Sequence, residues 1–280
     1  MTPEKKRIYI AVKTYPAISE KYSELVCTAG VLEDGSWIRL YPVPFRLLND
    51  EEKYPKYTWI QAEIVKNTSD FRKESFRPIL SSPIKVEPKP RKVNWEARRE
   101  ILFKNKQIHT NLHNLIEIAQ NKNDPVSLAL FKPQRIIDFK IEADSREWDA
   151  KKLASLHAQS QQFSLFQTIE EIQEEFRVVQ KVPYKFSYLF EDDTGKRSKL
   201  MIEDWEIGML YFNCLKSANG NEKIAVSKVK ERYLNYFLTR DVYFILGTTL
   251  AHHYISINPF IIIGIFWPPF PPENQQMSLF

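Results

Sequence analysis

The fold of this chain is decided near its start, by the stretch Leu25-Val26-Cys27-Thr28-Ala29-Gly30-Val31-Leu32-Glu33-Asp34-Gly35-Ser36-Trp37-Ile38-Arg39-Leu40-Tyr41-Pro42. Its first eight residues form a β-type run, and Asp34-Gly35 then supplies a hairpin turn signal. The residues from Trp37 to Tyr41 alternate in polarity as a half-buried strand does. Pro42 and Pro44 end that pattern. The stretch therefore predicts two strands joined by a tight turn.

Two further strand patterns flank this pair. Residues 8–12 form a short β-type run, and residues 57–65 alternate in polarity until Lys66. Several short strands at this spacing are typical of a small barrel or a strongly bent sheet. A lysine-rich segment with Pro83, Pro88 and Pro90 then indicates a connector.

The rest of the chain mixes helices with strands. Asn94 is the expected N-cap of a helix whose apolar stripe continues to Ala119 and which stops before Pro125. Helices are also predicted over 203–216 and 225–238, and β-rich segments over 136–141, 178–190, 242–246 and 260–267. The prolines from Pro268 to Pro272 predict a stiff extended spacer.

Composition indicates a folded protein of a reducing compartment. Of the 280 residues, 43% are hydrophobic and 13% aromatic, which is sufficient for a substantial core. Seven glycines against 17 prolines argue against a glycine-loop nucleotide binder. Cys27 and Cys214 lie among apolar residues and are predicted to be buried free thiols. No signal peptide and no apolar run of bilayer length is visible, so we expect a cytoplasmic protein without a membrane partner.

The opening strands resemble those of uncharacterised prokaryotic proteins with dual OB-like domains. The resemblance rests on Val26-Cys27-Thr28-Ala29-Gly30-Val31, on Asp34-Gly35 and on Trp37-Ile38-Arg39-Leu40-Tyr41-Pro42, although Tyr41 separates Arg39-Leu40 from Pro42. It covers roughly the first 45 residues and implies a small β-barrel suited to single-stranded nucleic acid.

Aromatic and cationic residues interleave in this N-terminal region. Sites for single strands combine stacking platforms with cations, and the formal charge of +5 is compatible with a surface that faces phosphates. The candidate nucleic-acid-binding residues are Lys13, Tyr15, Arg39, Tyr41 and Arg46. Alternatively, the aromatic residues pack the barrel interior and the lysines solvate its outside. For Tyr15, Tyr41 and Arg46, near strand ends and turns, both interpretations stay open.

The last five residues resemble the pentapeptide with which many bacterial polymerases and repair proteins bind the DNA sliding clamp. They are Gln276, Met277, Ser278, Leu279 and Phe280, with Met277 where leucine is commoner. The resemblance implies that Leu279 and Phe280 fill an apolar pocket of the clamp while Gln276 hydrogen-bonds its rim. The alternative is an end that folds back onto the core. A second match, at residues 162–166, is predicted to be core instead.

Complete catalytic or metal constellations are not visible. Lys199, Glu203 and Asp204 have the residue types of a Mg²⁺-dependent nuclease. We favour a helix start for the two acidic residues, because carboxylates there stabilise the positive end of the helix dipole.

Histidine pairs offer a second kind of chemistry. His252 and His253 suit phosphate contact or general-base catalysis, although a polar loop is the favoured interpretation. His109 and His113 have the i, i+4 spacing of metal ligands on the predicted helix. No third ligand accompanies them, so no metal site is assigned.

We therefore expect an α+β protein in four parts. These are an OB-like small β-barrel over 1–88, a helical connector over 89–125, a C-terminal mixed α/β domain over 126–267, and an extended proline-rich tail with the clamp-binding peptide over 268–280. The favoured function is that of a DNA-associated accessory protein recruited to the bacterial sliding clamp. It would bind single-stranded or junction DNA in replication, repair or defence, without catalysis or cofactor. The alternatives are a nuclease that uses Mg²⁺, or another nucleic-acid-processing enzyme, and an adaptor without DNA contact.

Overall fold

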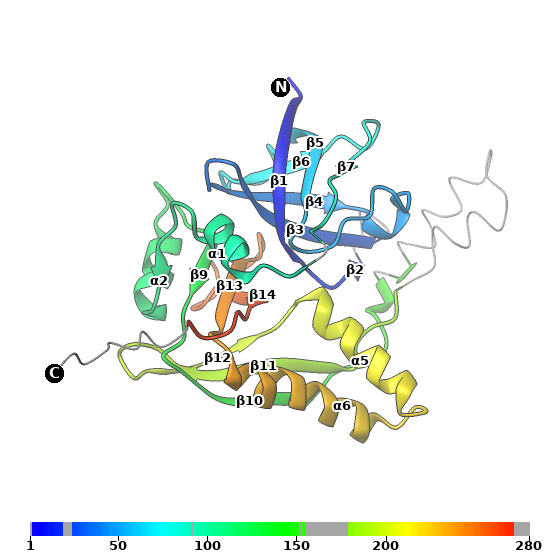
Figure 1. The fold of residues 1–280 in the computed structure, drawn as a ribbon, viewed down its shortest axis with the longest axis vertical. Coiled ribbons are helices and arrows are strands. Elements are labelled where there is room, and N and C mark those ends of the chain that lie inside the picture. The colour runs from blue at the N-terminus through cyan, green and yellow to red at the C-terminus, as the bar shows by residue number, and fades with distance from the viewer. Residues whose placement is uncertain (1, 19–23, 91, 152, 155–178, 272–280) are drawn as a thin grey trace.

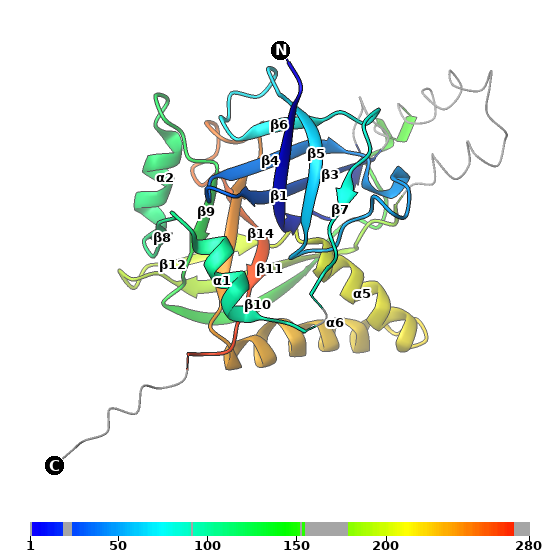
Figure 2. The same ribbon diagram turned by 45° about the horizontal axis from the view of Figure 1, so that its top comes forward.

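The N-terminal part is a closed five-stranded barrel, as predicted (Figures 1 and 2). The computed structural model describes residues 2–18, 24–90, 92–151, 153–154 and 179–271. Around the barrel the strands follow the order β1-β3-β4-β6-β5, and β5 pairs back with β1. Their bounds are β1 Glu4–Lys13, β3 Glu24–Leu32, β4 Trp37–Val43, β5 Trp59–Lys66 and β6 Ser75–Pro78. The β4–β6 pair is parallel and the other pairs are antiparallel, which is the connectivity of an OB-fold.

Strand β4 continues through Pro42, where the sequence pattern predicted its end. The ladder between β3 and β4 shifts register, because Val26 pairs with Val43 while Thr28 pairs with Leu40. Such a bulge leaves residues outside the ladder, so a proline without a backbone donor is accommodated there. Two short strands, β2 (Ala17–Ile18) and β7 (Lys85–Val86), and the 3₁₀ turn η1 (Phe45–Leu47) complete this N-terminal barrel.

The single helix predicted from Asn94 to about Asn121 is wrong. The chain forms α1 (Trp95–Phe103) and α2 (Leu112–Gln120), with the short strand β8 (Ile108–His109) between them. Both helices begin at an asparagine N-cap, Asn94 for α1 and Asn111 for α2. The interruption has a tertiary cause, because residues 104–106 hydrogen-bond the carbonyls of the 33–35 turn. His109 and His113 therefore do not share a helix face.

The C-terminal part repeats the connectivity of the N-terminal barrel. Its first strand is split into β9 and β10, since β9 pairs with β13 while β10 pairs with β11. A parallel bridge between Ile202 and Ile262 joins the end of β12 to β14. The circuit is β9/β10-β11-β12-β14-β13 and back to β9, again with one parallel contact. The bounds are β9 Leu128–Phe131, β10 Arg135–Ala143, β11 Tyr184–Glu191, β12 Arg197–Met201, β13 Tyr243–Thr248 and β14 Phe260–Phe266. We call this part the C-terminal barrel.

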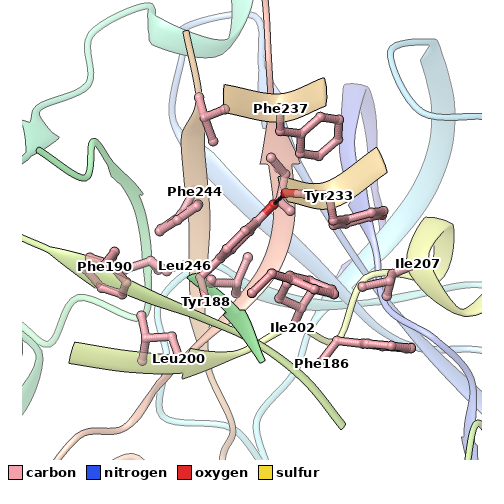
Figure 3. Close-up of a cluster of buried hydrophobic side chains, with 14 of the residues drawn as sticks. Phe186, Tyr188, Phe190, Leu200, Ile202, Ile207, Tyr233, Phe237, Phe244 and Leu246 are labelled. Atoms are coloured by element: carbon pink, nitrogen blue, oxygen red, sulfur yellow. Dashed lines mark hydrogen bonds between the residues drawn. The ribbon is translucent and has the colours of Figure 1, made fainter. Parts of the chain in front are cut away.

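Helices close one end of the C-terminal barrel (Figure 1). They are α5 (Trp205–Ser217), α6 (Glu222–Lys230), the π-helical turn η2 (Glu231–Tyr236) and the 3₁₀ turn η3 (Phe237–Thr239). Figure 3 shows Tyr188 reaching from β11 to the η2 backbone, where its hydroxyl hydrogen-bonds the Tyr233 carbonyl. The Tyr188 ring also stacks on the Phe244 ring, with the two ring centres 5.2 Å apart. No helix within the described ranges is long and apolar enough to span a membrane.

Three buried clusters hold the molecule together. One fills the N-terminal barrel around Ile10 and Ile38, and another fills the C-terminal barrel around Tyr188 and Phe244. The third lies between the barrels. Its members come from β1, β3, α1, β9, β13 and β14 and include Tyr9, Ala11, Ala29, Val31, Leu102, Leu130, Ile245 and Ile263. The two barrels therefore share a core.

Candidate nucleic-acid interface

The second and third strands of an OB-fold, with the loops L12 and L45, form its usual ligand face. In the N-terminal barrel these strands are β3 and β4; Ala29 and Val31 of β3 lie in the shared core, and Arg39 of β4 bonds Ser127. Gly264 of β14 approaches β1 so closely that a Cβ there would lie 2.8 Å from Val12 Cγ2. What stays open beside β3 and β4 is a cavity between the barrels.

This inter-barrel pocket has a volume of about 360 Å³. Its walls come from the β1–β3 connection, from β3 and β4, from the β5–β6 connection and from the β13–β14 connection. The lining residues used below are Tyr15, Cys27, Arg39, Tyr41, Arg72, Glu203, Thr248 and Thr249. Three of the five nucleic-acid candidates, Tyr15, Arg39 and Tyr41, thus meet in one cavity.

Arg39 forms the floor of the inter-barrel pocket. One of its terminal nitrogens donates to the Ser127 carbonyl and hydroxyl, at 3.2 and 3.0 Å, and lies 3.8 Å from Glu74. Its other terminal nitrogen lies 3.5 Å from Cys27 Sγ. Arg39 Nε and Thr249 Oγ1 are buried without a hydrogen-bond partner among the described residues.

Arg72 brings a second guanidinium to the pocket wall. It forms a two-point ion pair with Asp70, at 2.8 and 2.5 Å, and donates to the Thr248 carbonyl at 2.6 Å. Burial alone would raise the pKa of Asp70, but the hydrogen bonds from Arg72 and its positive charge outweigh burial and lower that pKa. Arg72 thereby ties the β5–β6 connection of one barrel to the end of β13 in the other.

Two half-buried tyrosines supply the aromatic surface. Tyr15 packs against Gly208 of α5, where an added Cβ would lie 2.3 Å from the ring, and its hydroxyl donates to the Gln180 carbonyl. Tyr41 stands at the β3–β4 bulge, opposite Cys27. Bulges turn side chains away from the regular ladder and are common beside functional sites.

Glu203 lies on the rim that the inter-barrel pocket shares with a smaller cavity of about 230 Å³. The surrounding protein partly desolvates the Glu203 carboxyl and so raises its pKa. Its neighbour Asp204 caps α5 by accepting from the Glu206 amide, so the helix-start interpretation is confirmed for Asp204. Asp204 is also ion-paired with the buried Lys56 at 3.2 Å.

The remaining catalytic candidates are Lys199, His252 and His253. Lys199, on β12, pairs with Glu142 at 3.0 Å. His253 is buried, with Nε2 donating to the Ala119 carbonyl and Nδ1 bonded to the Thr248 hydroxyl, each at 2.7 Å. His252 is exposed. Within the described ranges, His, Cys, Asp and Glu side chains nowhere gather in a group of three that could hold a metal ion.

Two nucleic-acid candidates do not line the pocket. Lys13 is buried, its amine donating to the Tyr54 carbonyl at 3.0 Å and lying 4.2 Å from the Phe45 ring centre. Burial lowers the pKa of Lys13 to about 8. Arg46 is half-buried in η1. The clamp-like peptide Gln276–Phe280 and its internal counterpart at residues 162–166 lie outside the described residues.

Sequence reasoning missed several residues at this interface. Arg72 is not among the predicted site residues, and Cys27, predicted to be buried, is half-exposed on the pocket wall. Thr248 and Thr249 carried no signal, since threonine at a strand end is common. Phe71 was also missed, although an aromatic residue within the polar segment 67–74 is itself a sign of an exposed contact.

Comparison with known families assigns the chain in two pieces. Residues 108–280 match the family described as Domain of unknown function (DUF8757), and residues 4–104 match Domain of unknown function (DUF8758). The first match spans more than half of the chain, which therefore belongs to the DUF8757 family. No curated protein matches the chain.

One solved structure similar to the chain is "Structure of murine DNA binding protein bound with ds DNA". The sequence identity is 8% and the TM-score 0.32, over 96% of this chain and 95% of that one. A likeness at this score is too low to support a function.

Proposed function

We propose that this protein binds single-stranded nucleic acid at the inter-barrel pocket and reaches DNA through its C-terminal peptide. The observation that carries the first part is the convergence of Tyr15, Arg39 and Tyr41 in one cavity at the ligand face of an OB-fold. The second part rests on the sequence of residues 276–280 alone.

The pocket suits one unstacked nucleotide. A cavity of about 360 Å³ lies in the size range of small-ligand sites. The rings of Tyr15 and Tyr41 offer stacking surface, and the guanidinium groups of Arg39 and Arg72 lie in the same wall. A base within a duplex is paired and enclosed by its neighbours, so it cannot enter the cavity. The cavity therefore selects for single strands.

Binding is tested by fluorescence anisotropy with a labelled oligothymidylate and the full-length protein. Base stacking contributes about 1–3 kcal/mol per base, so Tyr41→Ala should weaken binding by about 5- to 150-fold. Phe270→Ala is the matched control, because Phe270 is an exposed aromatic residue outside the pocket. Affinity should fall with added salt. Oligonucleotide binding that Tyr41→Ala leaves unchanged would refute the pocket as the site.

Recruitment is tested with purified bacterial sliding clamp. The full chain should bind, and a chain ending at Pro272 should not, because Leu279 and Phe280 are the proposed anchors. A Leu279→Ala/Phe280→Ala variant keeps the length of the tail and should behave like the truncation. Clamp binding that survives the truncation would rule out the tail as the docking peptide.

The nuclease alternative receives no support from the described side chains. Asp204 is committed to Lys56 and to the start of α5, while Lys199 is paired on another strand. Incubation of the protein with labelled DNA and Mg²⁺ or Mn²⁺ separates the two functions. We expect binding without cleavage.

A further inference from the structure

Two loops in equivalent positions of the two barrels meet beside the inter-barrel pocket. The β5–β6 connection (67–74) and the β13–β14 connection (249–259) each join the fourth and fifth strands of a barrel. Phe71 from the first loop and Tyr254 from the second are stacked, with ring centres 4.8 Å apart and planes 26° from parallel. Their exposed fractions are 45% and 38%, so both rings reach solvent.

The buried His253 holds this aromatic pair in place. Its ring meets the Phe71 ring at 5.0 Å and the Tyr254 ring at 4.6 Å, both edge to face. The Ala119 carbonyl only accepts, so His253 Nε2 carries the proton and Nδ1 accepts from the Thr248 hydroxyl. Both ring nitrogens of His253 therefore have hydrogen-bond partners, which fix the orientation of its ring. The rings are pre-organised, which reduces the entropy lost on binding.

The aromatic pair is continuous with the pocket. Arg72, the residue after Phe71, lines the pocket, and so do Leu250 and Ala251 of the loop that carries Tyr254. Lys73 is exposed two residues beyond Phe71, where its amine pairs with the equally exposed Asp124. A strand leaving the pocket along these loops therefore passes the two rings and a lysine.

We propose that Phe71 and Tyr254 form a stacking platform for an unpaired base of the same strand whose neighbouring nucleotide occupies the inter-barrel pocket. This inference rests on the proposed function and extends it to a second subsite. The ligand is single-stranded, because a base within a duplex has no free face for an aromatic ring. Stacking on aromatic side chains is tolerant of sequence, so the platform adds affinity without base preference.

The test replaces the rings without removing apolar surface. In the oligothymidylate assay, Phe71→Leu and Tyr254→Leu should each weaken binding by about 5- to 150-fold, the equivalent of one lost stacking contact. Phe71→Tyr and Tyr254→Phe keep the rings and should stay within about twofold of the wild type. The salt dependence of binding should be unchanged in the leucine variants, because no cation is removed.

Ile257 supplies the matched control. It is exposed on the same loop as Tyr254 but outside the stack, so Ile257→Ala should leave oligonucleotide affinity unchanged. An equal loss in Ile257→Ala and Phe71→Leu would overturn the platform in favour of a general apolar contact.

The failures of the two proposals are distinguishable. If Tyr41→Ala weakens binding while both leucine variants bind like the wild type, the platform is refuted and the pocket stands. If the wild type binds no oligonucleotide, both are refuted. Thermal unfolding of each variant, compared with the wild type, excludes loss of the fold as the cause.

Discussion

Replacement of Lys56 by methionine removes a buried charge that links the N-terminal barrel to the start of α5. Lys56 Nζ lies 3.2 Å from Asp204 Oδ2 and 2.9 Å from Glu206 Oε2. The side chains of Lys56 and Asp204 are 3% and 1% exposed, whereas that of Glu206 is 49% exposed. Methionine keeps most of the volume, so the variant leaves Asp204 as a buried carboxylate without its cation.

The expected loss is large. Breaking a buried ion pair by removing one partner costs about 3–5 kcal/mol, a sizeable part of a total stability of about 5–15 kcal/mol. Glu206→Gln removes the half-exposed partner and should cost no more than about 1 kcal/mol. Asp204→Asn in the Lys56→Met background removes the orphaned charge and should recover part of the loss.

The loss should also depend on pH. Burial raises the pKa of Asp204, Lys56 opposes that effect, and without Lys56 the pKa rises further. A carboxyl whose pKa is raised by folding costs stability as the pH rises from its unfolded-state pKa to its folded-state pKa, and the higher the folded-state pKa, the larger the full cost above it. Lys56→Met should therefore lose more stability at pH 8 than at pH 5.

These differences in the free energy of unfolding are measured by urea denaturation, with tryptophan fluorescence as the signal. The wild type, Lys56→Met, Glu206→Gln and the Lys56→Met/Asp204→Asn double variant are compared at both pH values. If Lys56→Met costs no more than Glu206→Gln, the Lys56–Asp204 pair does not hold the barrels together and the reasoning is refuted.

Three further substitutions test other contacts of the structure. Burial lowers the pKa of Lys13 to about 8, so the wild type should gain stability over Lys13→Met between about pH 8 and 10, by at most about 1.4 kcal/mol per pH unit. Urea denaturation at several pH values measures this, and a constant difference would contradict it. Gly208→Ala should weaken oligonucleotide binding, because its Cβ would lie 2.3 Å from the Tyr15 ring; unchanged anisotropy would exclude Tyr15 from the site. Phe244→Ala should cost about 3–5 kcal/mol in urea denaturation, whereas the exposed Phe270→Ala should stay within about 0.5 kcal/mol.

The strands were predictable because their signal is local. Residues 8–12, 242–246 and 260–267 are apolar runs; the first covers half of β1, the second most of β13, and the third all of β14. The sequence analysis did not infer why the apolar residues in these runs are uninterrupted. On β13, Phe244 and Leu246 face the core of the C-terminal barrel, while Tyr243 and Ile245 face the other barrel. A strand buried on both faces loses the alternation of a half-buried strand, so these runs marked the contact between barrels.

The parts that sequence reasoning missed depend on contacts distant in the chain. The predicted long helix was interrupted because residues 104–106 bind the 33–35 turn, roughly seventy residues away in sequence. The C-terminal barrel was hidden because its first strand is split and its closure between β12 and β14 is a single bridge. Likewise, Tyr15 and Tyr41 were found from local cues, but their convergence with Arg72 and Thr249 depends on how the barrels pack.

The packing of the barrels limits how a nucleic acid can bind. An isolated OB-fold exposes the face of its second and third strands, along which single strands of about 4–16 nucleotides lie. Here the outer faces of β1 and β3 contribute to the shared core, and Arg39 of β4 is covered by Ser127. Among the described residues of this ligand face, a strand therefore gains access at the pocket and at the two loops beside it. We infer a short binding site, near the lower end of that range, in which a few stacked bases supply most of the affinity. A site this small needs a second attachment to hold the protein on DNA, which is the part that the proposed clamp-binding tail would play.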